Sequence, residues 1–435
     1  MNYIVVILVL SFIAYKIYQK TRVPEGLKNI PTLSFLDLLI EIFTKVGPDK
    51  RWENTRDVLE KEGIGKLWFN GQWTITVTDL GLVKDIMTKT DLYPKALLEE
   101  SFPTSLITKY YGTNVVLSNG DVWKRHRRIA NPSFRNLPVH VFVESTTKLL
   151  NVMEKIDNEP IEVKSLMHRL ALDVLGKAAF GFDFNNLEDP NNVYVTTYNE
   201  VMAELSKPLY FVFSFLDYLP RFEALRKIEK LNSLYDEIVE SKHKAMKMGE
   251  IEKKINNKSA DLLEHMVYAC NDPDNPTLTN EELRQQKELK YMNMVINENL
   301  RLYPPVAQLP QRFNSQEIKF RNHVIPAKTP IELSIYGIHH SSRNWKDPEK
   351  FIPERFENEK HDHYSWLGFG GGNRLCLGIN FSLIEQRIML CALLRKYEVS
   401  LPADSIHKDK LQIEPEVSGT SGPHPVPLIF KRRTE

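Results

Sequence analysis

The sequence predicts a mainly α-helical fold with small β-sheets, built as one large unit behind a short N-terminal segment. Helical spacing runs through long stretches between residues 137 and 256, whereas the β-rich runs are short and widely separated. No internal repeat, low-complexity block or second linker follows residue 34. The hydrophobic share of 42% and the charged share of 26% are those of an ordinary globular protein.

Charge and cysteine content exclude several classes of function. Lys and Arg number 57 against 56 for Asp and Glu, a formal net charge of +1, so we expect no nucleic-acid or acidic-polymer partner. The three cysteines, Cys270, Cys376 and Cys391, include no close pair. A disulfide framework or a cysteine-rich zinc site is therefore not expected, and reduced thiols in a cytosol-facing protein are the simpler interpretation.

The N-terminus carries an uncharged apolar run, Tyr3–Tyr15, followed closely by Lys16, Lys20 and Arg22. A membrane-spanning helix needs about 20 residues, so the run suffices only if it extends to Tyr18 and Lys16 snorkels. A cleaved signal peptide is the alternative, because its apolar core needs only about 7–15 residues. The basic residues follow the run, and positive charge favours the cytoplasmic side. We therefore expect a retained anchor and a cytosolic body.

The predicted organisation has three parts. Residues 1–21 form the hydrophobic anchor with its basic flank. Residues 22–34 contain the sequence RVPEGLKNIP, which is typical of a Pro-containing hinge. Residues 35–435 form the body, which we treat as a single domain.

The first elements of the body follow from local signals. Asp49–Gly63 has helix-forming composition and ends at a Gly suited to a C-cap. Residues 66–77 (KLWFNGQWTITV) give two β-rich runs joined by Asn70-Gly71, a strong hairpin signal. Asp79–Lys89 returns to helical spacing.

Longer helices and then short strands follow. The helical stretches, broken by Pro and Gly, are 137–156, 164–180, 194–206 and 222–256. Residues 317–339 predict short strands around Pro326 and Pro330, and the tail, residues 411–430, predicts a further hairpin. The aromatic and apolar stretch 207–219 (KPLYFVFSFLDYL) indicates either a core or lid segment between helices, or the membrane-dipping rim of an entrance.

The segment Phe369–Gly378 (FGGGNRLCLG) carries the strongest chemical signal. Three consecutive glycines let the backbone approach a flat ligand closely and adopt positive φ. Cys376 comes just before an amphipathic helix, residues 379–399, whose free N–H groups and dipole favour the thiolate form. Arg374 is placed to bind a carboxylate. A buried structural cysteine in a glycine loop is the alternative, which the whole ten-residue pattern disfavours.

This loop resembles the signature loop of cytochromes P450, and two further motifs occur in the order that the family requires. Glu298-Asn-Leu-Arg301 is similar to the ExxR motif, whose i, i+3 spacing puts both side chains on one helix face. Residues 351–356 (FIPERF) are similar to the PERF element, so the resemblance implies that Arg355 joins Glu298 and Arg301 behind the haem. A lone ExxR would say little, but the three motifs together are specific.

The resemblance also implies how haem b is held. Cys376 would be the thiolate ligand of the iron, where a thiolate pushes electron density onto the metal and helps to break the O–O bond. Trp123 and Arg127 match the WxxxR helix, which aims both towards the haem propionates. Arg312 and His339 resemble two further propionate contacts, although a core or surface role for His339 is an equal alternative. The implied cofactor-binding residues are Trp123, Arg127, Arg312, His339, Phe369, Gly372, Arg374, Cys376 and Gly378.

The resemblance covers nearly the whole chain and implies the P450 fold and a monooxygenase activity. Electrons would come from NADPH through a reductase, and one atom of O2 would enter a small apolar substrate that no motif identifies. Lys124, Arg125 and Arg128 lie off the WxxxR face and form either a solvated basic surface or a docking patch for an acidic reductase. The microsomal type of the family implies the endoplasmic reticulum membrane as the location.

One element of the family is missing from the sequence. Cytochromes P450 carry a long distal helix with a motif similar to [AG]-G-x-[DE]-[TS], whose acid and alcohol deliver protons for oxygen activation, and no such motif occurs here. Thr279–Glu282 resembles the capping box that opens this helix, but Arg284 runs directly into Gln285 and the approach to the ExxR helix. Crossing a domain about 30 Å wide takes about 20 residues. We therefore expect a deletion at Arg284/Gln285 and identify no catalytic residue.

Three explanations of the missing helix remain open. A gene-model or splicing artefact of an ordinary monooxygenase is favoured, because two well-formed motifs are joined in frame. A non-catalytic haem-binding remnant is the second. The third is a P450-like isomerase or dehydratase, which needs no proton relay, but such enzymes keep the helix. Sequencing the transcript across the Arg284 codon would distinguish the first explanation from the others.

Overall fold

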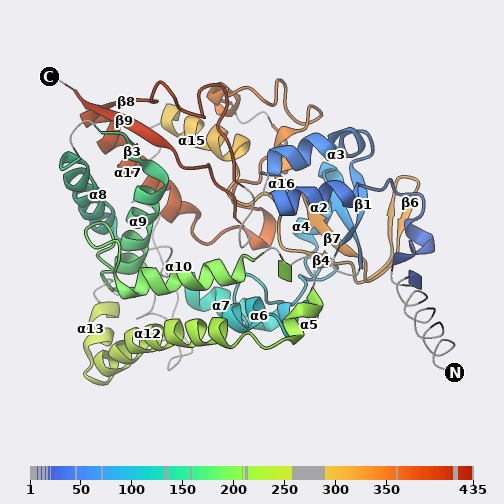
Figure 1. The fold of residues 1–435 in the computed structure, drawn as a ribbon, viewed down its shortest axis with the longest axis horizontal. Helices are drawn as coiled ribbons and strands as arrows, with labels where there is room; N and C mark the ends of the chain where they lie inside the picture. Colours follow the sequence, from blue (N-terminus) through green and yellow to red (C-terminus); the bar gives the residue numbers. More distant parts are fainter. Residues whose placement is uncertain are drawn as a thin grey trace.

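The computed structural model of the protein describes residues 7, 11, 15, 18–19, 21–44, 47–69, 72–131, 134, 137–156, 159–207, 209–210, 214–256, 290–358, 361–414 and 420–433. This part of the chain is mostly helical with small sheets, as predicted (Figure 1). Most of the apolar run Tyr3–Tyr18, and the whole junction at Arg284/Gln285, lie outside these residues. Within the described ranges, no helix combines the length and the apolar character needed to cross a membrane.

A four-stranded sheet occupies one side of the molecule (Figure 1). Its strands are, in spatial order, β1 (Ile64–Phe69), β2 (Gln72–Val77), β7 (Pro330–Leu333) and β4 (Arg312–Phe313). β1 and β2 pair antiparallel, with Phe69 opposite Gln72, so the predicted hairpin strands are confirmed; their Asn70-Gly71 turn lies outside the described residues. β7 lies parallel to β2 and antiparallel to β4, which brings Arg312 to the edge of this sheet.

Helices α3 (Pro48–Glu62) and α4 (Leu80–Thr88) confirm two further predictions. α3 ends at Gly63 in the left-handed conformation, with φ of 77°. α4 begins at Asp79, whose carboxylate accepts the Leu82 N–H at 3.1 Å. Each helix thus starts or stops where its sequence signal predicts.

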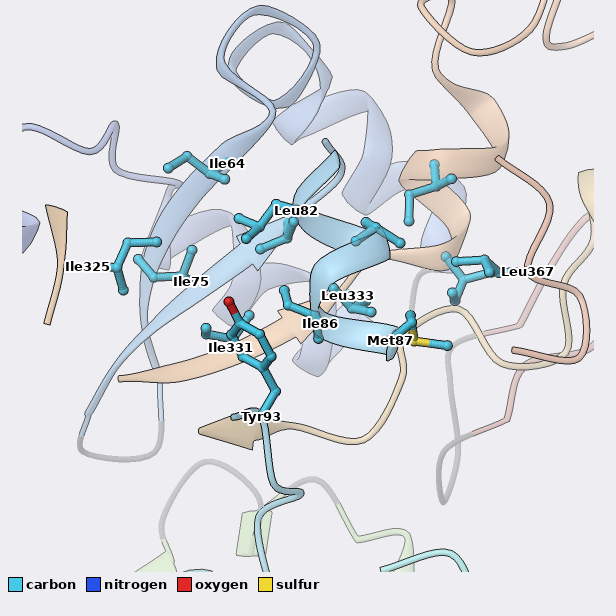
Figure 2. Close-up of a cluster of buried hydrophobic side chains, with 14 of the residues drawn as sticks. Ile64, Ile75, Leu82, Ile86, Met87, Tyr93, Ile325, Ile331, Leu333 and Leu367 are labelled. Atoms are coloured by element: carbon cyan, nitrogen blue, oxygen red, sulfur yellow. The ribbon is translucent and has the colours of Figure 1, made fainter. Parts of the chain in front are cut away.

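A hydrophobic core joins this sheet to α4. Figure 2 shows Ile64, Ile75 and Ile331 of the sheet beside Leu82 and Ile86 of the helix. β-branched side chains pack well on a pleated surface, and burial of each such residue stabilises the fold by about 1.5–3 kcal/mol. Other members of the same cluster, Met87, Tyr93 and Leu367, connect this core to the segments around Cys376.

The N-terminal segment is held against the same sheet by a buried lysine. The Lys66 ammonium donates hydrogen bonds to the carbonyl oxygens of Leu27 at 3.0 Å and Lys28 at 3.2 Å, and to that of Ile30. Leu27 and Ile30 are themselves buried, and the Leu33 N–H donates to the Lys66 carbonyl at 2.7 Å. The chain is therefore fixed to the sheet within the range predicted as a hinge.

The rest of the described chain is mainly helical. Its longer elements are α2 (Phe35–Thr44), α7 (Gly120–Ala130), α8 (Val139–Glu154), α9 (Val163–Leu175), α10 (Val193–Leu205), α12 (Phe222–Lys247), α13 (Glu250–Asn256), α15 (Lys290–Leu302) and α17 (Ile379–Lys396). Its short turns of helix are η1 (Glu25–Leu27), α5 (Leu98–Ser101), α6 (Leu106–Tyr111), η2 (Gly176–Phe180), η3 (Ser214–Tyr218), η5 (Pro353–Phe356) and η6 (Gly372–Arg374). One core unites α8, α9 and α17, and another unites α6, α10 and α12. The π turn η2 continues α9 as predicted, whereas the predicted helix 222–256 is two helices separated at Gly249, with φ of 73°.

Two β predictions need correction. In residues 317–339, β5 (Ile318–Phe320) and β6 (His323–Ile325) form a small hairpin, but α16 (Ile335–His340) is a helix, because the Ser334 hydroxyl accepts the Gly337 N–H at 3.1 Å and starts a turn. In the tail, an antiparallel bridge joins Ile413 to Pro423. The strand that follows does not continue that hairpin: β9 (Pro427–Arg432) pairs with β8 (Tyr397–Ser400) and β3 (Ile161–Glu162).

Candidate functional site

The backbone conformation of the glycine-rich loop before α17 requires glycine at two positions. Gly370 and Gly372 have φ of 72° and 58°. A Cβ at Gly372 would lie 2.5 Å from the carbonyl oxygen of Met87, so the loop can approach the end of α4 only without a side chain. The Cys376 N–H donates to the Phe369 carbonyl at 3.0 Å, which closes the loop. The Cys376 side chain is exposed.

Cys376 lies two residues before the N-cap of α17, which is Gly378. The Ser382 N–H donates to the Gly378 carbonyl at 2.9 Å and starts the helix. From the other side, the Arg127 guanidinium of α7 donates to the Leu375 carbonyl at 2.8 Å. Two helices thus meet at the backbone that carries the cysteine.

Three arginines and a tryptophan converge beside this loop. The Arg374 guanidinium carbon lies 4.0 Å from the centroid of the Trp123 ring, a cation–π contact. Arg312 is 3% exposed and donates to the Tyr93 carbonyl at 2.9 Å. The structure therefore gathers Trp123, Arg127, Arg312 and Arg374, which the sequence placed on three separate segments.

Several N–H donors of these side chains have no hydrogen-bond partner among the residues that the structure describes. The Arg312 Nε, and both Nε and Nη1 of Arg374, are buried without a hydrogen bond. Buried N–H groups are paired in most proteins, and an unpaired one costs about 1–3 kcal/mol. In the described part of the chain, no ion pair joins Arg127, Arg312, Arg374 or the neighbouring Lys95 to a carboxylate. The site thus presents unsatisfied positive charge.

The electrostatics agree with this description. Burial lowers the pKa of Arg312 to about 10, and the charge of Arg374 adds to the effect. Burial also lowers the pKa of Arg374 to about 10, with a contribution from Arg127. For Lys95, burial and then the charges of Arg312 and Arg374 lower the pKa to about 7. Like charges held together out of water favour the binding of an anion.

Haem fits this donor set. Its two carboxylates would satisfy the free N–H groups of Arg312 and Arg374, and a flat ring suits the close approach that the glycines permit. No cluster of three or more His, Cys, Asp or Glu that could hold a metal ion occurs among the described residues. The porphyrin nitrogens of haem would supply the further ligands of an iron bound by Cys376.

Behind the loop, Glu298 lies between two arginines. Its carboxylate accepts from the Arg301 Nε at 2.7 Å and Nη2 at 3.0 Å, and from the Arg355 Nε at 3.0 Å. It also accepts the Ile352 N–H at 2.9 Å. Arg301 in turn donates to the His339 carbonyl at 2.7 Å, so one buried network connects α15, α16 and η5.

His339 is a buried core residue in this structure. Its Nε2 accepts the Leu367 N–H at 2.8 Å, and its Nδ1 lies 3.0 Å from the Arg301 carbonyl, to which it donates as the neutral tautomer. Burial lowers the pKa of His339 to about 3, so the imidazole is neutral. With both ring nitrogens occupied by the backbone, His339 supports the start of the cysteine loop and offers no group to a carboxylate. This arrangement favours the core alternative.

Sequence reasoning missed two residues of the site. Lys95 forms an isolated antiparallel bridge with Arg312, and Asn119 accepts from Arg374 at 3.4 Å. Asn119 precedes Gly120 at the start of α7, a pair that indicates a helix start but not a binding site. Nothing local to Lys95 indicates its part in the site.

The family model of cytochrome P450 matches residues 31–287 and 283–423 of this chain. The two matched segments meet at residues 283–287, the stretch that contains the Arg284/Gln285 junction.

Among similar proteins, the cytochrome P450 monooxygenase xanG of Aspergillus fumigatus is 26% identical over 452 positions, covering 87% of this chain and 83% of that protein. Cytochrome P450-DIT2 of Saccharomyces cerevisiae is 24% identical, covering 92% of both chains. Cytochrome P450 3A16 of Mus musculus is 24% identical, covering 86% of this chain and 85% of that protein. Together with the site just described, these matches show that the chain belongs to the cytochrome P450 family of haem-thiolate monooxygenases.

Proposed function

We propose that this chain binds haem b through Cys376 and supports the NADPH-dependent monooxygenation of a small apolar substrate. The observation that carries the proposal is the convergence of guanidinium groups with unpaired N–H donors beside a cysteine that is held at the start of α17. Cys376 would ligate the iron, and Arg312 and Arg374 would bind the carboxylates, with Trp123 and Arg127 beside them. When bound, thiolate-ligated haem supplies the activation of O2 for transfer of one oxygen atom to an organic substrate.

The experiment that tests this assignment is the spectrum of the reduced carbon monoxide complex. The full chain reconstituted with haem is expected to show the band that gives the family its name, because that band requires a thiolate ligand. Cys376→Ala should abolish it, whereas Cys391→Ala and Cys270→Ala should retain it. An unchanged band in Cys376→Ala would refute the assignment of the ligand.

We propose further that electrons arrive from an acidic, NADPH-oxidising reductase at the basic surface of α7. Lys124, Arg125 and Arg128 are exposed there, on the helix whose Arg127 contacts the cysteine loop. Lys124 has an exposed ion pair with Asp121 at 3.4 Å, while no ion pair involves Arg125 or Arg128 in the described chain. Charge complementarity mainly raises the rate of encounter. Arg125→Glu is therefore expected to slow reduction by the reductase most at low salt, and an unchanged rate would contradict this docking surface.

The proposed location is the membrane of the endoplasmic reticulum, with the catalytic body in the cytosol. The apolar run Tyr3–Tyr18 and the basic residues after it support an anchor. A second support lies on α2, where Leu36, Ile40 and Phe43 are exposed on one helical face. Protease added to sealed microsomes should digest the body, and protection of the body would refute this orientation.

A further inference from the structure

Asn119 is used in an unusual way for a residue at the start of a helix. It is the N-cap of α7, a position where asparagine normally accepts a backbone N–H of the first turn. Its side chain makes no such bond here. The amide is directed instead to two other segments of the chain, which suggests that its role lies outside the helix.

The first of these segments contains Lys95. The Asn119 Oδ1 accepts the Lys95 N–H at 3.0 Å, and its Nδ2 donates to the Lys95 carbonyl at 2.8 Å. One side chain thus satisfies both main-chain groups of Lys95, as a neighbouring β-strand would. On its other edge, this segment pairs with β4: the Ala96 N–H donates to the Gln311 carbonyl at 2.8 Å, and Lys95 is bridged to Arg312.

The second segment is the cysteine loop. The Arg374 Nη2 donates to the same Oδ1 of Asn119 at 3.4 Å, a long hydrogen bond from a half-buried cation. This contact and the Trp123 ring hold the Arg374 guanidinium, while its Nε and Nη1 stay without partners. Asn119 therefore joins the chain segments of Arg312 and Arg374 to the helix that carries Trp123 and Arg127.

We propose that Asn119 is a positioning residue for the carboxylate-binding side of the haem site, where its amide holds Arg374 and the Lys95–Arg312 pair in place. The proposal rests on the proposed function, since it concerns the same cofactor. Asn119 itself need not touch haem. Its effect is to hold two mutually repelling cations in place, because neither Arg312 nor Arg374 forms an ion pair with a carboxylate among the described residues.

The experiment compares haem with its dimethyl ester, which has the same ring and iron but no carboxylates. Both are titrated into the full chain and into Asn119→Ala, and binding is measured from the absorbance of the bound haem. Asn119→Ala is expected to raise the dissociation constant for haem by about tenfold, the effect of one hydrogen bond to a charged group. The dissociation constant of the diester should stay unchanged.

The matched control is Asn192→Ala. Asn192 is the N-cap of α10 and does cap its helix, accepting the Val195 N–H at 3.0 Å. Its loss should lower the midpoint of thermal unfolding without changing the ratio of the two dissociation constants. Equal weakening of haem and diester by Asn119→Ala would mean a merely structural role and overturn the proposal, as would no weakening at all. Failure of the proposed function gives a different result: the wild-type chain would then lack the thiolate-type carbon monoxide band. The two failures are therefore distinguishable.

Discussion

Replacing Glu298 by glutamine tests whether the network behind the cysteine loop holds the fold together. Glu298 and Arg301 are both 0% exposed, and the carboxylate accepts four hydrogen bonds, two of them from Arg301. Glutamine has nearly the same shape, but it turns one acceptor into a donor that faces the Arg301 guanidinium. Arg301 then loses its counter-charge and keeps at most the glutamine oxygen and backbone carbonyls, those of His339 and Pro348 among them, as partners for a buried charge.

Breaking a buried pair in this way costs about 3–5 kcal/mol, a large share of a typical stability of about 5–15 kcal/mol. The assay is urea unfolding followed by circular dichroism. Glu354→Gln is the matched control, because Glu354 lies in the same region but is exposed, and its change should stay within about 0.5 kcal/mol. If the free energies of unfolding of the two variants differ by less than about 1 kcal/mol, the network does not stabilise the fold as we expect.

Three further predictions concern the loop, a half-buried acid and the missing segment. Gly372→Ala should destabilise the fold and weaken haem binding more than Gly370→Ala in the same titration, because only the Cβ at Gly372 would meet a backbone atom at 2.5 Å, against 3.9 Å at Gly370. Burial raises the pKa of Glu385 from 4.5 to about 7, so the folded chain retains a proton that the unfolded chain releases. Stability measured by urea unfolding should therefore fall as pH rises from about 4.5 through 7, and Glu385→Gln should remove this slope; equal slopes would contradict the burial of a neutral acid. Insertion of a family-like distal segment after Arg284 should raise coupled turnover by about 10²–10⁴, the usual contribution of a positioned proton donor, and comparable turnover of both forms would refute the need for it.

The sequence predicted those parts of the site in which the residues of one motif lie close together in the chain, so that local structure alone determines their arrangement. Glu298 and Arg301 are three residues apart on one helix, so their meeting follows from helical periodicity. Cys376 precedes α17 because the glycine loop and the amphipathic pattern are adjacent in sequence. Trp123 and Arg127 share a face of α7 because they are four residues apart on one helix.

The parts that could not be predicted depend on contacts between distant segments. Lys95 reaches Arg312 only because β4, a strand of two residues, pairs at a particular register, and no pattern of two residues encodes a register. Asn119 has the composition signal of an N-cap but not its hydrogen bond. The role of His339 could not be assigned from sequence, because the partner of each ring nitrogen depends on how α15 and residue 367 pack around it.

Lys66, which fixes the N-terminal segment to the sheet, also limits the length of chain between the proposed anchor and the body. If the run ending at Tyr18 lies in a bilayer, as we propose, only the residues from Gln19 to Pro24 separate it from the fixed η1 segment. Six residues span at most about 20 Å when fully extended. Because Lys66 binds the carbonyl groups of Leu27 and Lys28, these residues stay attached to the sheet. The body would therefore remain within that distance of the membrane surface. The same side of the body would face the lipid, from which an apolar substrate would come.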